Sequence, residues 1–466
     1  MDSTRGLRRQ VTACIIANQG LFLIGINLGW SSAVNEHLLS GVLGYKYTQD
    51  QLSWAVSLLD LGTVFAPLPT GYLMNKIGRK FTFLLIASLF TLSWCLKVIS
   101  VQPGFLYAAQ ILAGVARGVG LTVTPMYSGE IAETGLHGML STIFKLMFYS
   151  GMLLMIIVAP YMNYTTISYM GLTFSLLFFF SLFYIPDTPY YYCAVKKERE
   201  AFQSLKWLRN QDKTENASVL NKELAMIKVA IEKVMGEDSG FRGLIMKPSN
   251  RQALFIVLGL FILQRMIGLN TIIGYGSITL PKGHPFITPQ TGMISFVVAL
   301  FISSALIALF IDRIGTKPLL ISSSIGCGFC TSVIAVYYWC DRTNGKAAVA
   351  GFFWVPYLFF VLEAFVFSIG VGVVPTVYLS QLFPINVVGQ ASAASVIVAS
   401  FVTFVINKAY FYVGVQFGIF MMYVFFSMSA FGCAAFTHFF AIETRKKRDA
   451  EIVPVGSVIE TASARK

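Results

Sequence analysis

Apolar runs of about 20 residues recur along the 466-residue chain, and they constrain its fold more than any other feature. A run of this length can cross the hydrocarbon core of a bilayer as a helix, because a spanning backbone has to satisfy its own hydrogen bonds. We count about twelve such runs, and charged residues make up only 12% of the chain, against about 25% in soluble proteins. The sequence therefore predicts an all-α membrane protein with twelve transmembrane helices.

Charged, helix-favouring sequence separates the first six runs from the last six. The stretches KKEREAFQSLKWLRN and NKELAMIKVAIEKVMGEDSG are typical of short amphipathic helices. We therefore expect an N-terminal six-helix half at 1–189, a cytosolic helical linker at 190–249, a C-terminal six-helix half at 250–442 and a cytosolic tail at 443–466.

The net charge of +13 comes from Lys and Arg residues that gather between the apolar runs. This pattern follows the positive-inside rule for cytosolic loops, so we expect no nucleic-acid partner. Arg5, Arg8 and Arg9 precede the first run and predict a cytosolic N-terminus. The expected protein is a multi-pass protein of the plasma membrane, surrounded by the lipid bilayer, with both termini in the cytosol.

Two acceptor sequons for N-linked glycans provide a test of this topology. Asn163 lies in an expected external loop between the fifth and sixth runs, so it can carry a glycan. Asn216 lies in the expected cytosolic linker and should stay unmodified.

Patterns of enzyme chemistry are missing from the sequence. The four His residues are scattered, and no nucleotide-binding or metal-binding motif occurs. Cys327 and Cys330 form a CxxC inside an apolar run, where cysteines act as small packing residues. We expect no enzymatic activity, no cofactor and no metal.

One apolar run, LQRMIGLNTIIGYG at 263–276, contains polar side chains that a lipid-facing helix would not tolerate. In an unbroken helix, Arg265 and Asn270 would lie on opposite flanks of one face. A break at Gly268 or Gly274 would let both face one path, as glycine permits. The polar residues of this run are Gln264, Arg265, Asn270 and Tyr275.

The two halves also share a short sequence pattern. GYLMNKIGRK at 71–80 follows the second run, and FIDRIGTK at 310–317 follows the eighth. Each combines a glycine turn with basic residues, which suits a turn at the anionic inner membrane surface. The repeat predicts two pseudo-symmetric halves packed around a central path.

Seven short motifs extend this pattern over nearly the whole chain, in a fixed order and spacing. In that order and spacing they resemble the sugar porters of the major facilitator superfamily, and NLGWSS and SLKWLRN look most like the facilitated trehalose and glucose transporters. The resemblance implies the major facilitator fold and alternating access. The motifs are GYLMNKIGRK, PMYSGEIAE, IPDTPYYY, LQRMIGLN, DRIGTKPLL, VVPTVYLSQLFP and AIETRKKRDAEI.

The resemblance implies that the amides of Gln264 and Asn270 hydrogen-bond sugar hydroxyls. In an unbroken helix, the spacing of the run would also place Tyr275 on the same face as Gln264. An amide offers both a donor and an acceptor, as a hydroxyl does. The alternative for these amides is a hydrogen bond between helices. Arg265 departs from the family pattern, because it stands where a second Gln is usual.

Lys145 also replaces a Gln that commonly contacts substrate in this family. Together with Arg265 it could select an anionic solute. Alternatively, Lys145 reaches toward the cytosolic surface and Arg265 pairs with an acid in the membrane. Asp60 and Glu363 are the acids available for such a pair.

In the family, basic residues of the glycine turns pair with acids at the inner helix ends and close the cytosolic side. The N-terminal half keeps Arg79, Lys80 and Glu130 for this gate, and the C-terminal half keeps Asp312 and Arg313.

The C-terminal half has lost other parts of the gate. Gln381 stands in place of a Glu, Val388 in place of an Arg, and Thr316 in place of a turn Arg. Fewer latch pairs should weaken the outward-open state. Thr376 also replaces the Trp that usually follows Pro375.

Two further positions bear on the mechanism of transport. Asn27 stands where proton-coupled relatives have an Asp, and an amide cannot exchange a proton near neutral pH. Gly372 and Pro375 interrupt helical continuity and are candidates for a gating hinge.

These residues predict facilitative uniport of a sugar, such as glucose or trehalose, by alternating access. One alternative is a sensor or receptor that has the carrier fold but does not transport. A second is a carrier of an anionic, sugar-like organic solute. The expected partner is a small-molecule sugar or a related solute.

Overall fold

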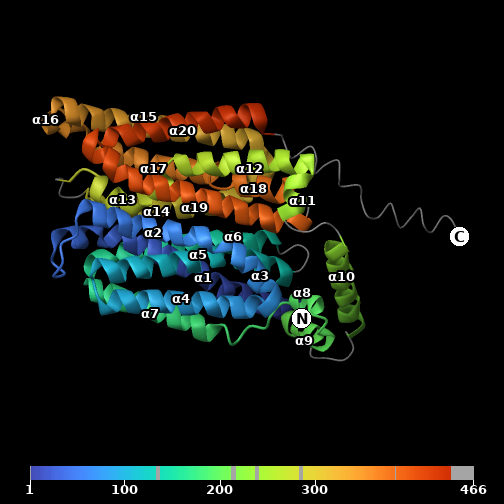
Figure 1. The fold of residues 1–466 in the computed structure, drawn as a ribbon. Coiled ribbons are helices and arrows are strands. Elements are labelled where there is room, and N and C mark those ends of the chain that lie inside the picture. Colours follow the sequence, from blue (N-terminus) through green and yellow to red (C-terminus); the bar gives the residue numbers. More distant parts are fainter. Residues whose placement is uncertain are drawn as a thin grey trace.

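The computed structural model is almost entirely helical, as the apolar runs predict (Figure 1). Its helices lie roughly parallel and form two bundles side by side, the N-terminal half in blue to cyan and the C-terminal half in yellow to red. No strand occurs in the residues described, which are 2–132, 137–210, 217–236, 241–282, 287–383 and 385–441.

The N-terminal half is built from the first helices of the chain. They are α1 (Asp2–Ser40), α2 (Gln49–Phe65), α3 (Pro67–Ile77), α4 (Arg79–Ile99), α5 (Pro103–Ile131), α6 (His137–Val158), the short η1 (Ala159–Tyr161) and α7 (Tyr164–Ser181).

Short helices then lead into the C-terminal half. The linker comprises α8 (Pro189–Ala194), α9 (Glu198–Arg209), α10 (Ala217–Gly236) and α11 (Phe241–Met246). The C-terminal half comprises α12 (Pro248–Met266), α13 (Leu269–Thr279), α14 (Pro289–Ile314), α15 (Thr316–Asn344), α16 (Lys346–Val349), η3 (Ala350–Phe352), α17 (Trp354–Ile369), α18 (Val374–Leu382), α19 (Ile385–Gln416) and α20 (Ile419–Phe440).

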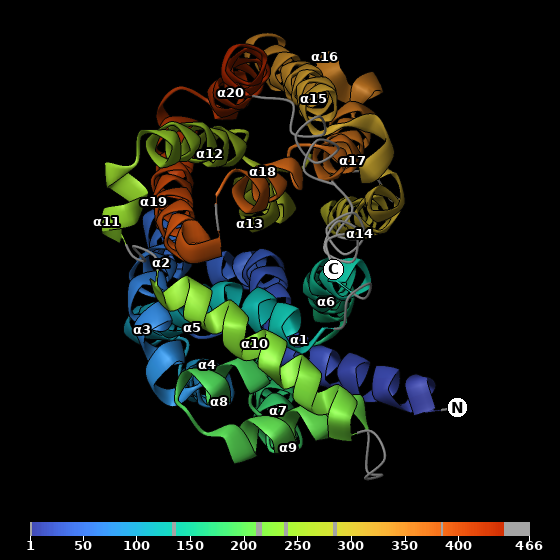
Figure 2. The ribbon, with the colours of Figure 1, turned by 90° about the vertical axis from the view of Figure 1, so that its right-hand side faces the viewer.

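All linker helices gather at one end of the bundles, on the right in Figure 1 and toward the viewer in Figure 2. We call this the linker end and the opposite end the far end. α9 and α10 are joined by an ion pair between Arg209 and Glu223 at 2.6 Å. The linker is therefore a folded unit attached to one end of the molecule.

Ten helical segments in the described residues are long and apolar enough to cross a membrane, and the bent pair α2 and α3 makes eleven. α7 falls just outside that set, with 18 residues and several polar side chains. It nevertheless packs along α4 for its full length, about 27 Å, as a crossing helix would (Figure 1). α7 is therefore the helix that corresponds to the remaining predicted span.

Two spans are interrupted where the sequence places glycine. α12 and α13 form one stretch, Pro248–Thr279, that breaks at Gly268, whose φ of 89° suits glycine. α17 ends at Ile369 and α18 begins at Val374, with Pro375 in its first turn and the backbone N–H of Gly372 bonded to Phe367. The sequence predicts a break at Gly268 or at Gly274. The structure confirms Gly268, whereas Gly274 lies within α13.

Close helix contact in the N-terminal half depends on small residues. Gly25 and Gly29 of α1 lie against the backbone of α6, and a Cβ at Gly29 would sit 2.8 Å from the carbonyl oxygen of Met152. A Cβ at Gly25 would overlap the carbonyl oxygen of Phe148. Glycines four residues apart allow two helices to approach this closely, and dispersion forces then hold them.

A charged side chain is buried in the same half. Lys97 of α4 is fully buried, and its Nζ makes no hydrogen bond in the described part of the chain. The ammonium lies 4.0 Å from the ring centre of Trp30 and 4.1 Å from that of Trp94. Cation–π attraction to two indoles, each about 2 kcal/mol when desolvated, offsets part of the burial cost.

Gly25→Ala is expected to lower the yield of folded protein and the thermal midpoint of unfolding, because the methyl group forces α1 away from α6. Fluorescence-detected size-exclusion chromatography with a thermal ramp measures both. The matched control is Gly71→Ala in α3, where a Cβ meets nothing within 4 Å. That change should be neutral or gain about 0.5–1 kcal/mol. Equal behaviour of the two variants would contradict the close packing.

Candidate functional site

Hydrogen bonds between the two halves gather toward the far end. Asn35 of α1 donates to the carbonyl oxygen of Gly274 at 2.6 Å, and Ser277 of α13 donates to the carbonyl oxygen of Ser32 at 2.6 Å. Closer to the surface, Lys282 pairs with Glu36 at 2.8 Å. These contacts join α1 to the C-terminal half, and they hold the halves together at the far end.

Asp60 lies deeper in the same seam and is bound from both halves. One carboxylate oxygen accepts from Arg117 of α5 at 2.9 Å, and the other accepts from the Nδ2 of Asn407 of α19 at 2.8 Å. Asn407 in turn accepts from Thr271 of α13 at 2.7 Å. Asp60, Arg117 and Asn407 are all buried, so this network connects four helices inside the bundle.

Arg265, at the end of α12, lies close enough to Asp60 and Arg117 for their charges to interact. Its guanidinium makes no hydrogen bond or ion pair in the described part of the chain, and its Nε is buried without a partner. Of the two acids expected to be available to Arg265, Asp60 and Glu363, it is Asp60 that lies nearby. Both of its oxygens, however, are bonded to other residues.

The amides of the 263–276 run have different environments. Gln264 donates to the carbonyl oxygen of Val371, in the break between α17 and α18, at 2.6 Å, while its Oε1 has no partner among the described residues. Asn270 is partly exposed, and its Nδ2 is unpartnered there as well. Gln264 therefore makes the interhelical bond and also keeps a free acceptor.

Tyr275 occupies a packing position. Its side chain is fully buried, its ring stacks on Tyr410 with centroids 5.1 Å apart, and its hydroxyl donates to the carbonyl oxygen of Asn407 at 3.2 Å. The break at Gly268 turns α13, so that Tyr275 faces α19. This geometry does not favour the prediction that Tyr275 contacts substrate together with the amides of Gln264 and Asn270.

Asn27, in α1, is 1% exposed, and neither atom of its amide has a partner among the described residues. A buried, unsatisfied amide is costly and usually marks a place where a water or a ligand binds. Among the described residues, this amide makes no bond to a neighbouring helix.

Lys145, in α6, is partly exposed and has no hydrogen bond or ion pair in the described residues. Tyr149 lies one turn further along α6 on the same face, packs against the core of the C-terminal half, and lies near Arg265. This face of α6 therefore lies at the seam.

Glu363 does not pair with either cation. Glu363 is fully buried in α17, and both of its carboxylate oxygens lack partners in the described structure. The ionisable groups that lie near it are Cys327, Cys330 and Tyr423, all of the C-terminal half. The expectation that Glu363 is available to neutralise Lys145 or Arg265 is wrong, because its carboxylate forms no ion pair with either cation in the described residues.

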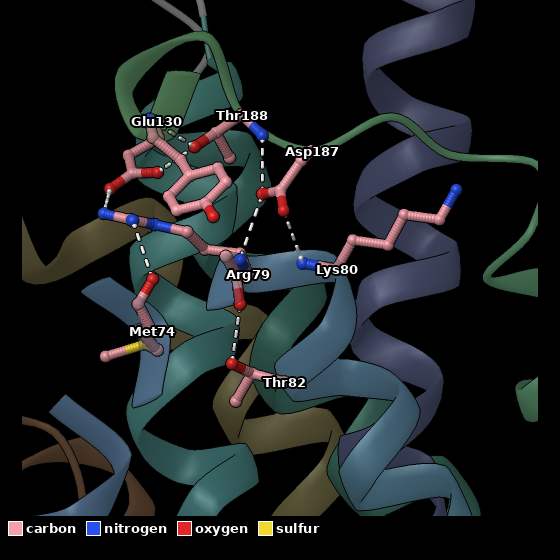
Figure 3. Close-up of polar contacts among 9 residues, drawn as sticks. Met74, Arg79, Lys80, Thr82, Glu130, Asp187 and Thr188 are labelled. Atoms are coloured by element: carbon pink, nitrogen blue, oxygen red, sulfur yellow. Dashed lines mark hydrogen bonds and ion pairs between the residues drawn. The ribbon is translucent and has the colours of Figure 1, made fainter. Parts of the chain in front are cut away.

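At the linker end, Arg79 and Glu130 form an ion pair at 2.6 Å (Figure 3). Arg79 also donates to the carbonyl oxygen of Met74 at 3.2 Å, and Thr188 donates to the second oxygen of Glu130. The pair ties α4 and α5 to the start of α8. It lies within the N-terminal half and its linker.

Asp187 completes this cluster, and the sequence analysis did not single it out. Its carboxylate accepts from the backbone N–H groups of Arg79 at 3.0 Å and Thr188 at 2.9 Å, and from that of Lys80 (Figure 3). Burial raises the pKa of the Asp187 carboxyl, and these backbone bonds oppose the rise. The signal in the sequence was an acid that directly precedes an N-cap Thr.

The C-terminal half has fewer such contacts among the described residues. Gln381 and Thr376 are exposed, and Lys317 donates to the carbonyl oxygen of His438 at 2.9 Å. The side chains of Asp312 and Arg313 lie outside the described residues, and so does Asn216.

Two bundles of membrane-crossing helices, joined by a surface linker and by a polar seam with broken helices, define a carrier of the major facilitator type. The sequence profile of the family described as "Sugar (and other) transporter" matches residues 13–454. The chain belongs to this family of sugar transporters.

Relatives and solved structures agree with this assignment. The facilitated trehalose transporter Tret1 of Bombyx mori is 25% identical over 86% of this chain and 77% of its own length. Tret1 of Drosophila mojavensis is 25% identical over 86% of this chain and 46% of its own length, so the chain spans about half of that protein. The fold matches the partially occluded inward-open xylose transporter XylE of E. coli, with a TM-score of 0.75, 17% identity, and coverage of 93% of this chain and 100% of that one.

Asp60→Asn and Arg117→Gln are each expected to lower the thermal midpoint of the purified protein. Either change leaves a buried group without its partner, which costs about 3–5 kcal/mol. The double variant should lose less than the sum, with a coupling of about 0.5–3 kcal/mol. Asp50→Asn is the matched control, because the Asp50 side chain that pairs with Lys408 is 73% exposed, and exposed pairs contribute about 0–1 kcal/mol. Strictly additive losses would contradict the coupling.

Proposed function

We propose that this protein is a facilitative uniporter for a sugar or a similar polyhydroxylated solute, which works by rocking its two halves around a site in the seam. The observation that carries the proposal is a set of amide atoms without partners among the described residues: Oε1 of Gln264 and Nδ2 of Asn270, on either side of the α12–α13 break, and both amide atoms of Asn27 in α1. Sugar hydroxyls can donate to and accept from such atoms. The relatives named as trehalose transporters support the same class of solute.

Uniport is favoured over proton coupling by the groups in the seam. Asn27 has no proton to exchange. The carboxylate of Asp60 is bonded on both oxygens, and Glu363 is enclosed in the C-terminal half. A coupling acid has to exchange its proton with water on each side in turn, whereas Asp60 keeps its ion pair with Arg117 inside one half and Glu363 is fully buried.

Gln264→Ala and Asn270→Ala are each expected to lower uptake of labelled glucose or trehalose about fivefold to tenfold in proteoliposomes, since each removes a hydrogen bond to the solute. The matched control is Gln102→Ala, an exposed amide at the far end. An imposed pH gradient should leave the initial rate unchanged.

Two outcomes would count against this proposal. Uptake that rises with an inward proton gradient would contradict uniport. The absence of flux for any neutral sugar or acid, with folded protein confirmed by size-exclusion chromatography, would favour the sensor of carrier fold. The reduced set of latch residues in the C-terminal half is the feature that makes a sensor conceivable.

The topology proposed with this function places the linker end in the cytosol and the far end outside the plasma membrane. Asn163 supports this orientation, because it is exposed at the far end and precedes α7. In glycosylating cells, Asn163→Gln is expected to abolish the shift in gel mobility that glycosidase treatment produces. Asn216→Gln is the matched control and should change nothing. A glycan on Asn216 would invert the topology.

A further inference from the structure

Two cations at the seam have no acid of their own. Arg265 and Lys145 make no hydrogen bond or ion pair in the described part of the chain, although both lie in membrane-crossing helices. A charge at such a depth is costly, and it is usually retained where it faces a solute path or a partner. No acid of the described residues pairs with these two side chains, so an anionic ligand is the partner that they lack.

The acids nearby are already committed or enclosed. Asp60 balances Arg117, with which it forms a direct ion pair, and its second oxygen is bonded to Asn407. Glu363 is enclosed by groups of the C-terminal half. Because Asp60 already pairs with Arg117, no acid of the described residues compensates the positive charges of Arg265 and Lys145.

The two cations belong to opposite halves but lie along one path. Tyr149 of α6 packs against the C-terminal half and lies near Arg265, and Lys145 is one helical turn nearer the linker end than Tyr149. Gln264 precedes Arg265 directly in α12, and Asn270 lies in the first turn of α13, just after the break at Gly268. Two amides and a guanidinium without a partner among the described residues thus lie within six residues of one another around the break.

We propose that the solute of this carrier is an anionic sugar derivative, a sugar acid whose carboxylate binds Arg265 while its hydroxyls bind Gln264 and Asn270. The inference rests on the proposed transport function and narrows its substrate class. The planar guanidinium matches a carboxylate through two parallel hydrogen bonds, which an ammonium cannot do. Lys145 contributes attraction from the linker side, where it is partly exposed.

The experiment compares the binding of D-gluconate and D-glucose to the purified full-length protein, measured as the ligand-dependent rise in thermal midpoint. Chloride at matched ionic strength corrects for salt. Wild-type protein is expected to bind gluconate at least about tenfold more tightly than glucose, as a charge-assisted bidentate pair provides. Arg265→Gln should abolish this preference, because gluconate loses its charge-assisted pair while glucose, no longer penalised by an unpaired guanidinium, binds more tightly than it does to wild-type protein.

Two further variants sharpen the comparison. Lys145→Gln should weaken gluconate binding a few-fold relative to wild-type protein. Added salt should reduce this difference between the two proteins, because Lys145 attracts the carboxylate from a distance and salt screens that attraction. Lys346→Gln, an exposed cation in α16, is the matched control and should leave both affinities unchanged.

The outcomes separate this inference from the proposed function. Equal binding of gluconate and glucose, or a preference that survives Arg265→Gln, overturns the anionic substrate and leaves sugar transport standing. Tighter binding of glucose 6-phosphate than of gluconate overturns the carboxylate in favour of a phosphate. If neither the acid nor any neutral sugar binds, and no flux is seen, the proposed function fails together with the inference.

Discussion

The bonding of Asp60 is the interaction on which the arrangement of the two halves depends. Burying a carboxylate inside a membrane bundle is costly, and the partners of Asp60, one from each half, offset that cost. Arg117 belongs to the same half as Asp60, whereas Asn407 belongs to the other. Separating the halves at this depth would therefore strip one oxygen of its partner. Rocking of the halves must supply a replacement, from water or from a bound solute.

The two ends of the molecule are stabilised differently. At the far end, bonds such as those of Asn35 and Lys282 run between the halves. At the linker end, the cluster of Arg79, Glu130 and Asp187 lies within the N-terminal half and fixes the linker to it. Bonds within a half make it move as a rigid body, and bonds between halves set the relative stability of the two states. This distribution favours the state that is closed at the far end.

Much of the fold, and part of the candidate site, can be predicted from the positions at which polar residues interrupt the apolar runs of the sequence. Length and hydropathy predict the crossing helices, and Gly268 lies at the break expected near Arg265. The same signal was present at Arg117, a charge in an apolar run, and was missed. Tyr275 was placed with the substrate-binding residues because sequence spacing assumes a straight helix, which the break invalidates. Partner choices, such as Asn407 for Asp60, arise from helices far apart in the sequence and leave no local pattern.

The free guanidinium of Arg265 bears on selectivity as well as on affinity. A site that has to satisfy a buried polar group discriminates strongly against a ligand that lacks the matching group, because the group is then left unpaired. A neutral sugar that fills the hydroxyl contacts of Gln264 and Asn270 would still leave Arg265 without an acceptor. A sugar acid satisfies all three together. The replacement of the family's Gln by Arg265 thus both attracts the acid and penalises the neutral sugar, without any change in the amides that hold the hydroxyls.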